Sequence, residues 1–161
     1  DDFGARDVSE VGFGYILLRR PASGVVTLSR YERMPQPLPD GGIGAHLAGA
    51  LAAHDRLATL DDEGVAACVL VVEPDVTEAR HQLPGAEAPT VIKVRQGSGF
   101  GRALAVDPGL AALVGACDGD LPVGLLIDAI AELLEVDAAA LRDDLLPRVR
   151  ELVVDGFLRF A

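Results

Sequence analysis

The chain has 161 residues, of which 50% are hydrophobic, and a net charge of −11. This content allows one substantial core or two small ones and excludes an intrinsically disordered chain, and the longest apolar run, residues 65–72, is too short for a transmembrane helix of about 20 residues. The two cysteines, Cys68 and Cys117, lie far apart in apolar surroundings, so we expect reduced, buried thiols in a cytoplasmic protein without membrane contact.

The chain opens with an acidic stretch, DDFGARDVSE, which lacks the features of a signal peptide and does not begin with methionine. We therefore expect a fragment of a longer protein. Residues 1–34 are predicted to form a β-hairpin, with strands at residues 11–19 and 25–32 around a turn at PASG. The exposed edge of such a hairpin can pair with a second copy, which predicts a homodimer.

A small basic cluster with one aromatic residue lies on the predicted hairpin and is the candidate contact site for a substrate or partner: Arg19, Arg20, Arg30, Tyr31 and Arg33. Arginine beside an aromatic ring can hold RNA through phosphate pairing and base stacking. The alternative is a polar edge that keeps a strand from aggregating.

Three prolines within five residues exclude a helix or a central strand and predict a linker over residues 35–42. Asp40 is the expected cap of a helix from Ile43 to about Leu57, and a short helix is expected from Asp61. This interpretation makes the glycines of DGGIG part of a capped helix start.

The middle of the chain predicts strands. Residues 65–83 read as a strand that Pro74 interrupts, and residues 90–96 and 102–106 are expected to pair around the sequence GSGFG. A nucleotide-binding glycine loop follows a parallel strand and opens a helix, whereas this loop joins two strands. We therefore predict a hairpin loop with left-handed glycines.

The last third, residues 107–161, predicts a winged-helix-like unit: a helix capped by Asp107, a turn at CDGDLP, two amphipathic helices and an apolar strand. A single kinked helix through Pro147 is favoured over two short helices. The predicted apolar stripes are Val123, Leu126, Ile127, Ile130, Leu133 and Leu134 on one helix, and Leu141, Leu145, Val149, Leu152 and Val153 on the next. The expected fold class is α+β, with residues 43–161 as an α+β appendage.

No catalytic, cofactor-binding or metal-binding residue is predicted. His46, His54 and His81 lack the spacing of metal ligands, and no serine or cysteine stands in a nucleophile motif. The acidic pairs at residues 61–62 and 143–144 are interpreted as a helix start and a solvated face.

Two stretches, GFGYILLRR (residues 12–20) and residues 114–158, resemble the C-terminal part of actinobacterial SAM-dependent methyltransferases of the small-methyltransferase type. Residues 71–85 and 91–107 are similar to the section that joins them. In that family a class I Rossmann-like catalytic domain precedes an appended winged-helix-like domain. The resemblance implies that residues 11–31 are the last antiparallel strands of the catalytic sheet.

The resemblance also implies S-adenosylmethionine as the cofactor of the parent enzyme and an upstream catalytic domain as a partner. We expect this segment to pack on that domain or to help present a macromolecular substrate, for which RNA or a ribosomal component is our hypothesis. The chain lacks both the acidic-GxGxG loop for this cofactor and the Asn-Pro-Pro-aromatic motif for an amine substrate. No catalytic residue is therefore carried over, and this segment alone is expected to be inactive and to bind no cofactor.

Two alternative functions do not require a methyltransferase. The first is a free-standing interaction or dimerisation module. The second is a DNA-binding regulator, but from Asp107 onward the chain has eleven acidic residues against four basic ones. Because a duplex-binding surface needs the opposite sign, duplex DNA is not an expected partner.

Overall fold

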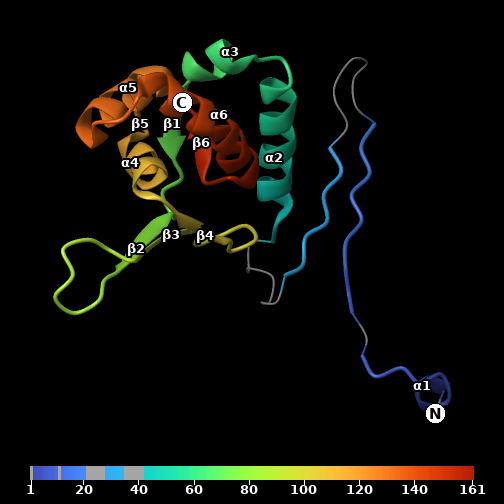
Figure 1. Ribbon diagram of the computed structural model, residues 1–161. Helices are drawn as coiled ribbons and strands as arrows, with labels where there is room; N and C mark the ends of the chain where they lie inside the picture. The colour runs from blue at the N-terminus through green and yellow to red at the C-terminus, as the bar shows by residue number, and fades with distance from the viewer. Residues whose placement is uncertain (1, 11, 21–27, 35–41) are drawn as a thin grey trace.

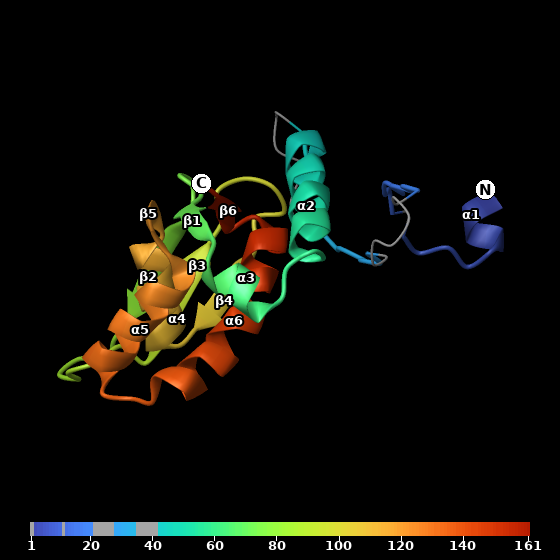
Figure 2. The ribbon, with the colours of Figure 1, turned by 90° about the horizontal axis from the view of Figure 1, so that it is seen from above.

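The computed structural model of the chain describes residues 2–10, 12–20, 28–34 and 42–161. It has the mixed α+β architecture that the sequence predicts. Helices and two small antiparallel sheets build one body from residues 42–161, hereafter the C-terminal body, while the N-terminal residues run beside it and away from it (Figures 1 and 2).

Aspartate caps begin several of the helices, which are α1 (Asp2–Ala5), α2 (Gly44–Leu57), α3 (Asp62–Ala66), α4 (Pro108–Ala116), α5 (Val123–Leu134) and α6 (Ala138–Asp155). The carboxylates of Asp61 and Asp107 accept hydrogen bonds from the first turns of α3 and α4. The cap at Asp107 and the start of a short helix at Asp61 were predicted from the sequence. Ile43 occupies the cap position of α2 without a side-chain bond. The predicted cap Asp40 and most of the predicted linker lie outside the described residues.

The strands are β1 (Val69–Val72), β2 (Thr77–His81), β3 (Val91–Arg95), β4 (Ala103–Val106), β5 (Asp118–Pro122) and β6 (Leu158–Phe160). They form two antiparallel sheets with the orders β5-β1-β6 and β2-β3-β4. The predicted interruption at Pro74 is confirmed: it separates β1 and β2, which belong to different sheets.

The GSGFG sequence forms the predicted hairpin loop between β3 and β4. Gly99 and Gly101 have φ angles of +58° and +60°, which other residues rarely adopt. A Cβ atom on Gly99 would lie 2.5 Å from Nδ1 of His46, so this glycine also permits a close approach to α2.

The predicted turn at CDGDLP is wrong, because residues 118–122 form β5 and pair with β1. Its sequence lacks the branched side chains typical of strands, and the pairing carries an irregularity between Val69 and Val71. Gly119 has a φ angle of +96°, and a Cβ there would lie 2.9 Å from Cγ2 of Val71. Tertiary pairing with β1 has therefore overridden local propensity.

The two amphipathic helices are confirmed, and α6 runs as one helix through Pro147. Most of the predicted stripe residues are buried, but Leu133 is 77% exposed and Leu134 is 39% exposed. Leu133 lies roughly 80° around the helix from Val123, at the margin of the buried face. Its assignment to the core was therefore wrong.

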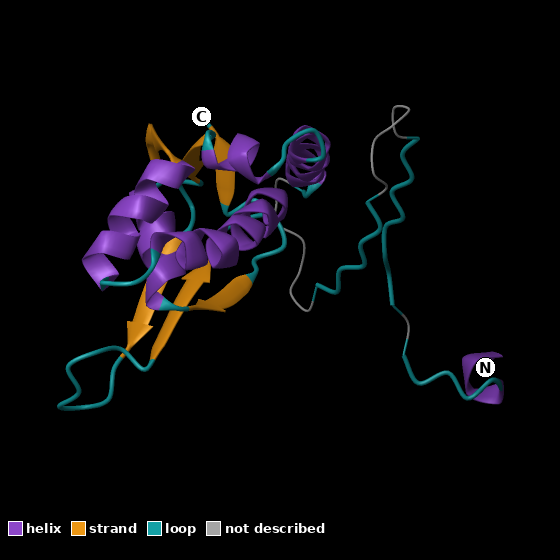
Figure 3. Cartoon of the chain, turned by 45° about the horizontal axis from the view of Figure 1, so that its top comes forward, coloured by secondary structure: helices purple, strands orange, loops and turns teal. Residues whose placement is uncertain are grey.

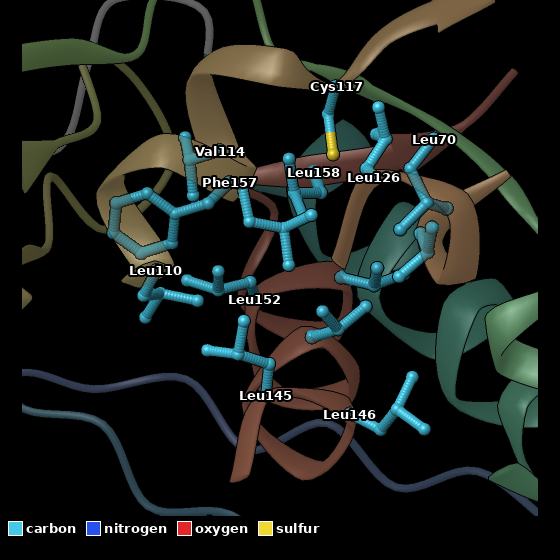
Figure 4. Packing of buried hydrophobic residues seen from close by; sticks show 14 of the residues in the cluster. Leu70, Leu110, Val114, Cys117, Leu126, Leu145, Leu146, Leu152, Phe157 and Leu158 are labelled. Atoms are coloured by element: carbon cyan, nitrogen blue, oxygen red, sulfur yellow. The ribbon is translucent and has the colours of Figure 1, made fainter. Parts of the chain in front are cut away.

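The core of the C-terminal body lies where these helices meet the β5-β1-β6 sheet. Phe157, Leu145 and Leu152 come together there with side chains from α4, β1 and β6, and all three are at most 2% exposed (Figure 4). The middle strand of the sheet, β1, comes from residues 69–72. The C-terminal helical unit is therefore not confined to residues 107–161. Among the described residues, no helix has the length and apolar character needed to cross a bilayer.

The predicted N-terminal β-hairpin is wrong for the residues that the structure describes. Residues 12–20 and 28–34 contain no strand, and residues 11 and 21–27, with the predicted turn, lie outside the described part. Two factors explain the result. Gly12 and Gly14 weaken the first strand, and an isolated two-stranded hairpin is at best marginally stable in water.

Candidate functional site

The candidate site is the N-terminal pair of extended stretches, residues 12–20 and 28–34, which we call the docking segment. Residues 13–18 carry large apolar side chains that no other part of the described chain covers. Phe13 is 99% exposed, and the next four residues, apart from glycine, are also exposed: Tyr15, Ile16, Leu17 and Leu18. In Figures 1 and 2 this stretch lies away from the C-terminal body.

The apolar residues of the docking segment would face both ways in an extended chain. Phe13, Tyr15 and Leu17 alternate with Ile16 and Leu18, and successive side chains of a strand point to opposite faces. A strand that is apolar on both faces is typical of a sheet covered by helices on both sides. The C-terminal body supplies neither the sheet nor the covering helices for this stretch.

Ion pairs hold the docking segment to the C-terminal body. Nη1 and Nη2 of Arg19 donate to the two carboxylate oxygens of Asp55, on α2, at 2.6 and 2.7 Å. This bidentate hydrogen bond lowers the pKa of Asp55 to about 2. From the sequence, Asp55 was expected only to lie near the end of a helix. Its partner Arg19 is 36 residues away in the chain, so no local pattern indicates the pair.

A second anchor joins the docking segment to the C-terminal end of α6 and to the β3–β4 loop. Arg30 pairs with Asp155, Arg102 pairs with Glu32, and Nη1 of Arg102 lies 3.3 Å from Oδ1 of Asp155. Nε2 of Gln96 donates to the backbone oxygen of Asp155 at 2.6 Å. The Arg102 and Asp155 side chains are each only 15% exposed, so this anchor is partly shielded from solvent.

A groove of about 630 Å³ separates residues 28–30 from α2 and α6. Apolar side chains line part of it, including Leu28, Leu57 and Val154, and the charged ends of Arg150 and Asp155 line the rest. The docking segment is therefore tethered to the body by charged groups across a groove, without joining its core.

The predicted basic cluster is not assembled as a single site. Arg19 and Arg30 each bind a carboxylate of the C-terminal body. Arg20 and Arg33 are exposed, and Tyr31 is 89% exposed. The structure therefore gives Arg19 and Arg30 an anchoring role and leaves the other three at the surface.

A second groove, of about 510 Å³, lies between α2, β6 and the loop that follows β3. It holds His46, Asp75 and Ser98. Nε2 of His46 and Oδ2 of Asp75 are buried without a hydrogen-bond partner in the described chain. Burial, followed by the positive charge of Arg102, lowers the pKa of His46, so this ring is neutral at pH 7.

The residues that line this second groove are not arranged as a catalytic or metal-binding group. The His46 ring packs edge-on against Phe100, with ring centroids 4.9 Å apart. Across the described residues, no group of three or more His, Cys, Asp or Glu is suited to hold a metal ion. The chemistry that the groove offers is hydrogen bonding to a small polar group.

The comparisons with known proteins bear on the C-terminal body. A family model described as "Domain of unknown function (DUF7782)" matches residues 51–160. The chain belongs to the DUF7782 family. No curated protein matches the chain.

The DUF7782 region contains all of the described strands, α3 to α6 and the C-terminal half of α2. It also contains three of the carboxylates and cations that hold the docking segment: Asp55, Arg102 and Asp155. The docking segment itself lies outside the region. The family match therefore separates a folded domain from the stretch that it anchors.

Other candidate residues within the DUF7782 region have structural roles. Arg142, Arg148 and Arg150 pair with Asp128, Asp107 and Asp62 respectively. Cys68 and Cys117 are free thiols, and burial raises the pKa of Cys117 to about 11. These three arginines are the basic residues of α6, and each is paired with a carboxylate, which leaves the helix poorly suited to bind duplex DNA.

Proposed function

We propose that this chain is the non-catalytic C-terminal part of a SAM-dependent methyltransferase, and that its docking segment packs on the upstream catalytic domain. The observation that carries the proposal is the exposed apolar stretch at residues 13–18, where Phe13 is 99% exposed. The same stretch, GFGYILLRR, is part of the resemblance to the family. The proposal places it at the end of the catalytic sheet.

Three features support this placement. The stretch is apolar on both faces, as a strand in a helix-covered sheet would be. Large exposed apolar patches mark interaction surfaces. The ion pairs of Arg19 and Arg30 fix where the stretch leaves the C-terminal body, so that a domain bound to it has a defined position.

The proposed role of the C-terminal body is to support the catalytic domain or to present a macromolecular substrate. We propose RNA or a ribosomal component as that substrate, and the cytoplasm as the location, which the two free thiols support. In this proposal S-adenosylmethionine binds to the catalytic domain, and the residues of the described chain contribute no catalytic group.

The first test reads the coding sequence upstream of Asp1. We expect an in-frame extension that contains the acidic-GxGxG loop and the Asn-Pro-Pro-aromatic motif. The longer protein should bind S-adenosylmethionine in calorimetry, and the 161-residue chain should not. An extension without both motifs, or a start codon directly before Asp1, would refute the proposal.

A second test locates the contact. Ile16→Glu should lower the melting temperature of the longer protein and leave that of the 161-residue chain unchanged, because Ile16 is exposed in the latter. Leu133→Glu is the matched control: Leu133 is also exposed, but on α5, so it should change neither protein. Equal effects of Ile16→Glu on both proteins would contradict the docking role.

The alternative function is a free-standing interaction or dimerisation module. The same exposed apolar stretch favours it, because a second copy of the chain could cover Phe13 and its neighbours. Light scattering at several protein concentrations separates the two functions. A stable dimer of the 161-residue chain that Ile16→Glu dissociates would favour this module over the methyltransferase proposal.

A further inference from the structure

The outer face of the β2-β3-β4 sheet is an open surface with an unusual composition. The pairing register places three sets of side chains side by side on this face, and all of them are exposed: Thr77, Ala79 and His81 of β2, Val91, Lys93 and Arg95 of β3, and Ala103 and Ala105 of β4. Ile92 and Val94 point the other way and are buried. Figure 3 shows the helices on one side of these strands.

This face is basic, although the chain as a whole carries a net charge of −11. Its charged residues are Lys93 and Arg95, with His81 at one end, and no aspartate or glutamate is among the eight residues. Most other basic residues of the C-terminal body are neutralised by carboxylates, as for Arg102 and Arg142. Within the described chain, Lys93 and Arg95 have no such ion pair.

The neighbours of the two cations are small. Lys93 stands between Ala79 and Ala105 in the pairing register, and Arg95 stands between Thr77 and Ala103. These neighbours are too short to cover the two long cationic side chains, which are therefore accessible to a ligand. Because they are two residues apart on one strand, their Cα atoms are separated by about 7 Å.

We propose that this face binds the phosphodiester backbone of a single-stranded nucleic acid, with Lys93 and Arg95 each contacting a phosphate. Two cations about 7 Å apart along one line suit successive phosphates of an extended strand. Binding is largely independent of sequence, because none of the eight face residues is Phe, Tyr or Trp, and among them His81, at one end, is the single ring that could stack a base.

Other partners fit this face less well. Protein interfaces centre on large side chains that fill pockets, and the residues beside the two cations are alanine and threonine. A membrane surface would also need apolar groups to insert. A sugar-phosphate backbone needs only cations and room to approach, which is what this face provides. The proposal stands on the sheet and does not depend on the proposed function.

The test measures the fluorescence anisotropy of labelled 12-nucleotide oligouridylate RNA with the 161-residue chain at 50 mM salt. Lys93→Glu with Arg95→Glu should weaken binding at least tenfold. The matched control is Arg20→Glu with Arg33→Glu, which changes the net charge equally on the docking segment and should weaken binding less than twofold. For two or three phosphate contacts, raising the salt to 200 mM should weaken wild-type binding about tenfold.

The nature of the strand is resolved by parallel measurements. Oligoadenylate RNA should bind within about twofold of oligouridylate if stacking contributes little, and DNA of the same length should show whether the ribose matters. Binding to both RNA and DNA supports a pure backbone contact, and binding to RNA alone supports RNA as the natural ligand.

Several outcomes would overturn the proposal: no wild-type binding at 50 mM salt, equal losses in the two double variants, or tighter binding to a duplex of the same length. Circular dichroism verifies that the variants are folded. If the two glutamates disturb the sheet, the variant Lys93→Gln with Arg95→Gln removes the same charges with less perturbation. This glutamine variant should also bind more weakly. Wild-type affinity in the folded glutamine variant would refute the contact.

Discussion

The C-terminal body and the docking segment hold their large apolar residues in opposite environments. Leu145 and Phe157 of the body are fully buried, whereas Phe13 of the docking segment is 99% exposed. Burying a leucine or phenylalanine contributes about 1.5–3 kcal/mol. A solvent-accessible ion pair such as Arg19–Asp55 contributes about 0–1 kcal/mol. The apolar burial that stabilises the fold therefore lies within the C-terminal body, whereas the docking segment is held to it by ion pairs.

The sharpest test of this contrast is a pair of leucine truncations. Leu145→Ala should lower the free energy of unfolding by about 2–5 kcal/mol, because it leaves a cavity in the core. Leu133→Ala, at a side chain that is 77% exposed, should lower it by less than about 0.5 kcal/mol. Urea denaturation measures both. Similar losses for the two variants would mean that the core has been misplaced.

Glycine substitutions test the joint between α6 and β6. Gly156 ends α6 with a φ angle of +77°, and a Cβ there would lie 3.1 Å from Cε1 of His46. Gly156→Ala should therefore destabilise the body by roughly 1–2 kcal/mol or more. Gly115→Ala is the control: Gly115 lies in α4 with open space around it, and alanine should stabilise that helix by up to about 1 kcal/mol. Thermal melts that rank the two variants in the reverse order would contradict these roles.

The pH dependence of stability tests the buried environment beside the second groove. Burial lowers the pKa of His46 below its ordinary value, so the unfolded chain binds a proton more readily than the folded one. The contribution of His46 to stability is therefore present above its unfolded pKa of about 6.5 and is lost as the pH falls through it. Between pH 7.5 and 5.5, His46→Gln should lose less stability than the wild type. Parallel urea midpoints for the two proteins would show that His46 does not titrate as described.

The smallest expected effect concerns the tether. Asp155→Asn should weaken the pairs with Arg30 and Arg102, changing the stability of the body by less than about 1 kcal/mol. It should nevertheless speed tryptic cleavage after Arg33 several-fold, because the docking segment separates from the body more often. Asp144→Asn is the control, since Asp144 pairs with Arg148 on the same helix. Unchanged cleavage in Asp155→Asn would show that other contacts hold the segment.

An NMR titration tests the other anchor, the ion pair of Arg19 with Asp55. Arg19→Gln should raise the pKa of Asp55 from about 2 toward the ordinary aspartate value, because the bidentate hydrogen bond is lost. The carboxyl carbon signal of Asp55, followed by NMR as the pH is lowered, reports this change. Asp128, which pairs with Arg142, should keep its lowered pKa and serves as the internal reference.

The sequence predicted those parts of the fold in which local pattern and tertiary packing agree. The stripe that includes Leu145 and Val149 repeats with helical spacing, and Asp107 followed by Pro108 starts a helix by well-understood local chemistry. β5 was missed because Asp118–Pro122 has no strand-like pattern and owes its conformation to β1. The hairpin failed for the opposite reason: its residues favour strands, but residues 12–20 and 28–34 pair with neither of the two sheets of the described chain.

Less of the candidate site than of the fold could be predicted from the sequence. The docking segment contains the predicted basic cluster, but the partners of Arg19 and Arg30 are distant acidic residues that no local pattern reveals. The open sheet face can be recognised in part from the sequence. In VIKVR the apolar and basic residues alternate, which places Lys93 and Arg95 on the same face of a strand. The alanines beside them became apparent only from the register with β2 and β4.

The position of β1 has a consequence for biosynthesis. It lies between β5 and β6, and both partners follow it in the chain. During translation, the four apolar residues of β1 therefore leave the ribosome well before either partner exists, and both hydrogen-bonding edges wait for later residues. Closing this sheet brings together residues that are far apart in sequence, which slows folding. A nascent chain of this kind has a window in which chaperones can protect an apolar edge.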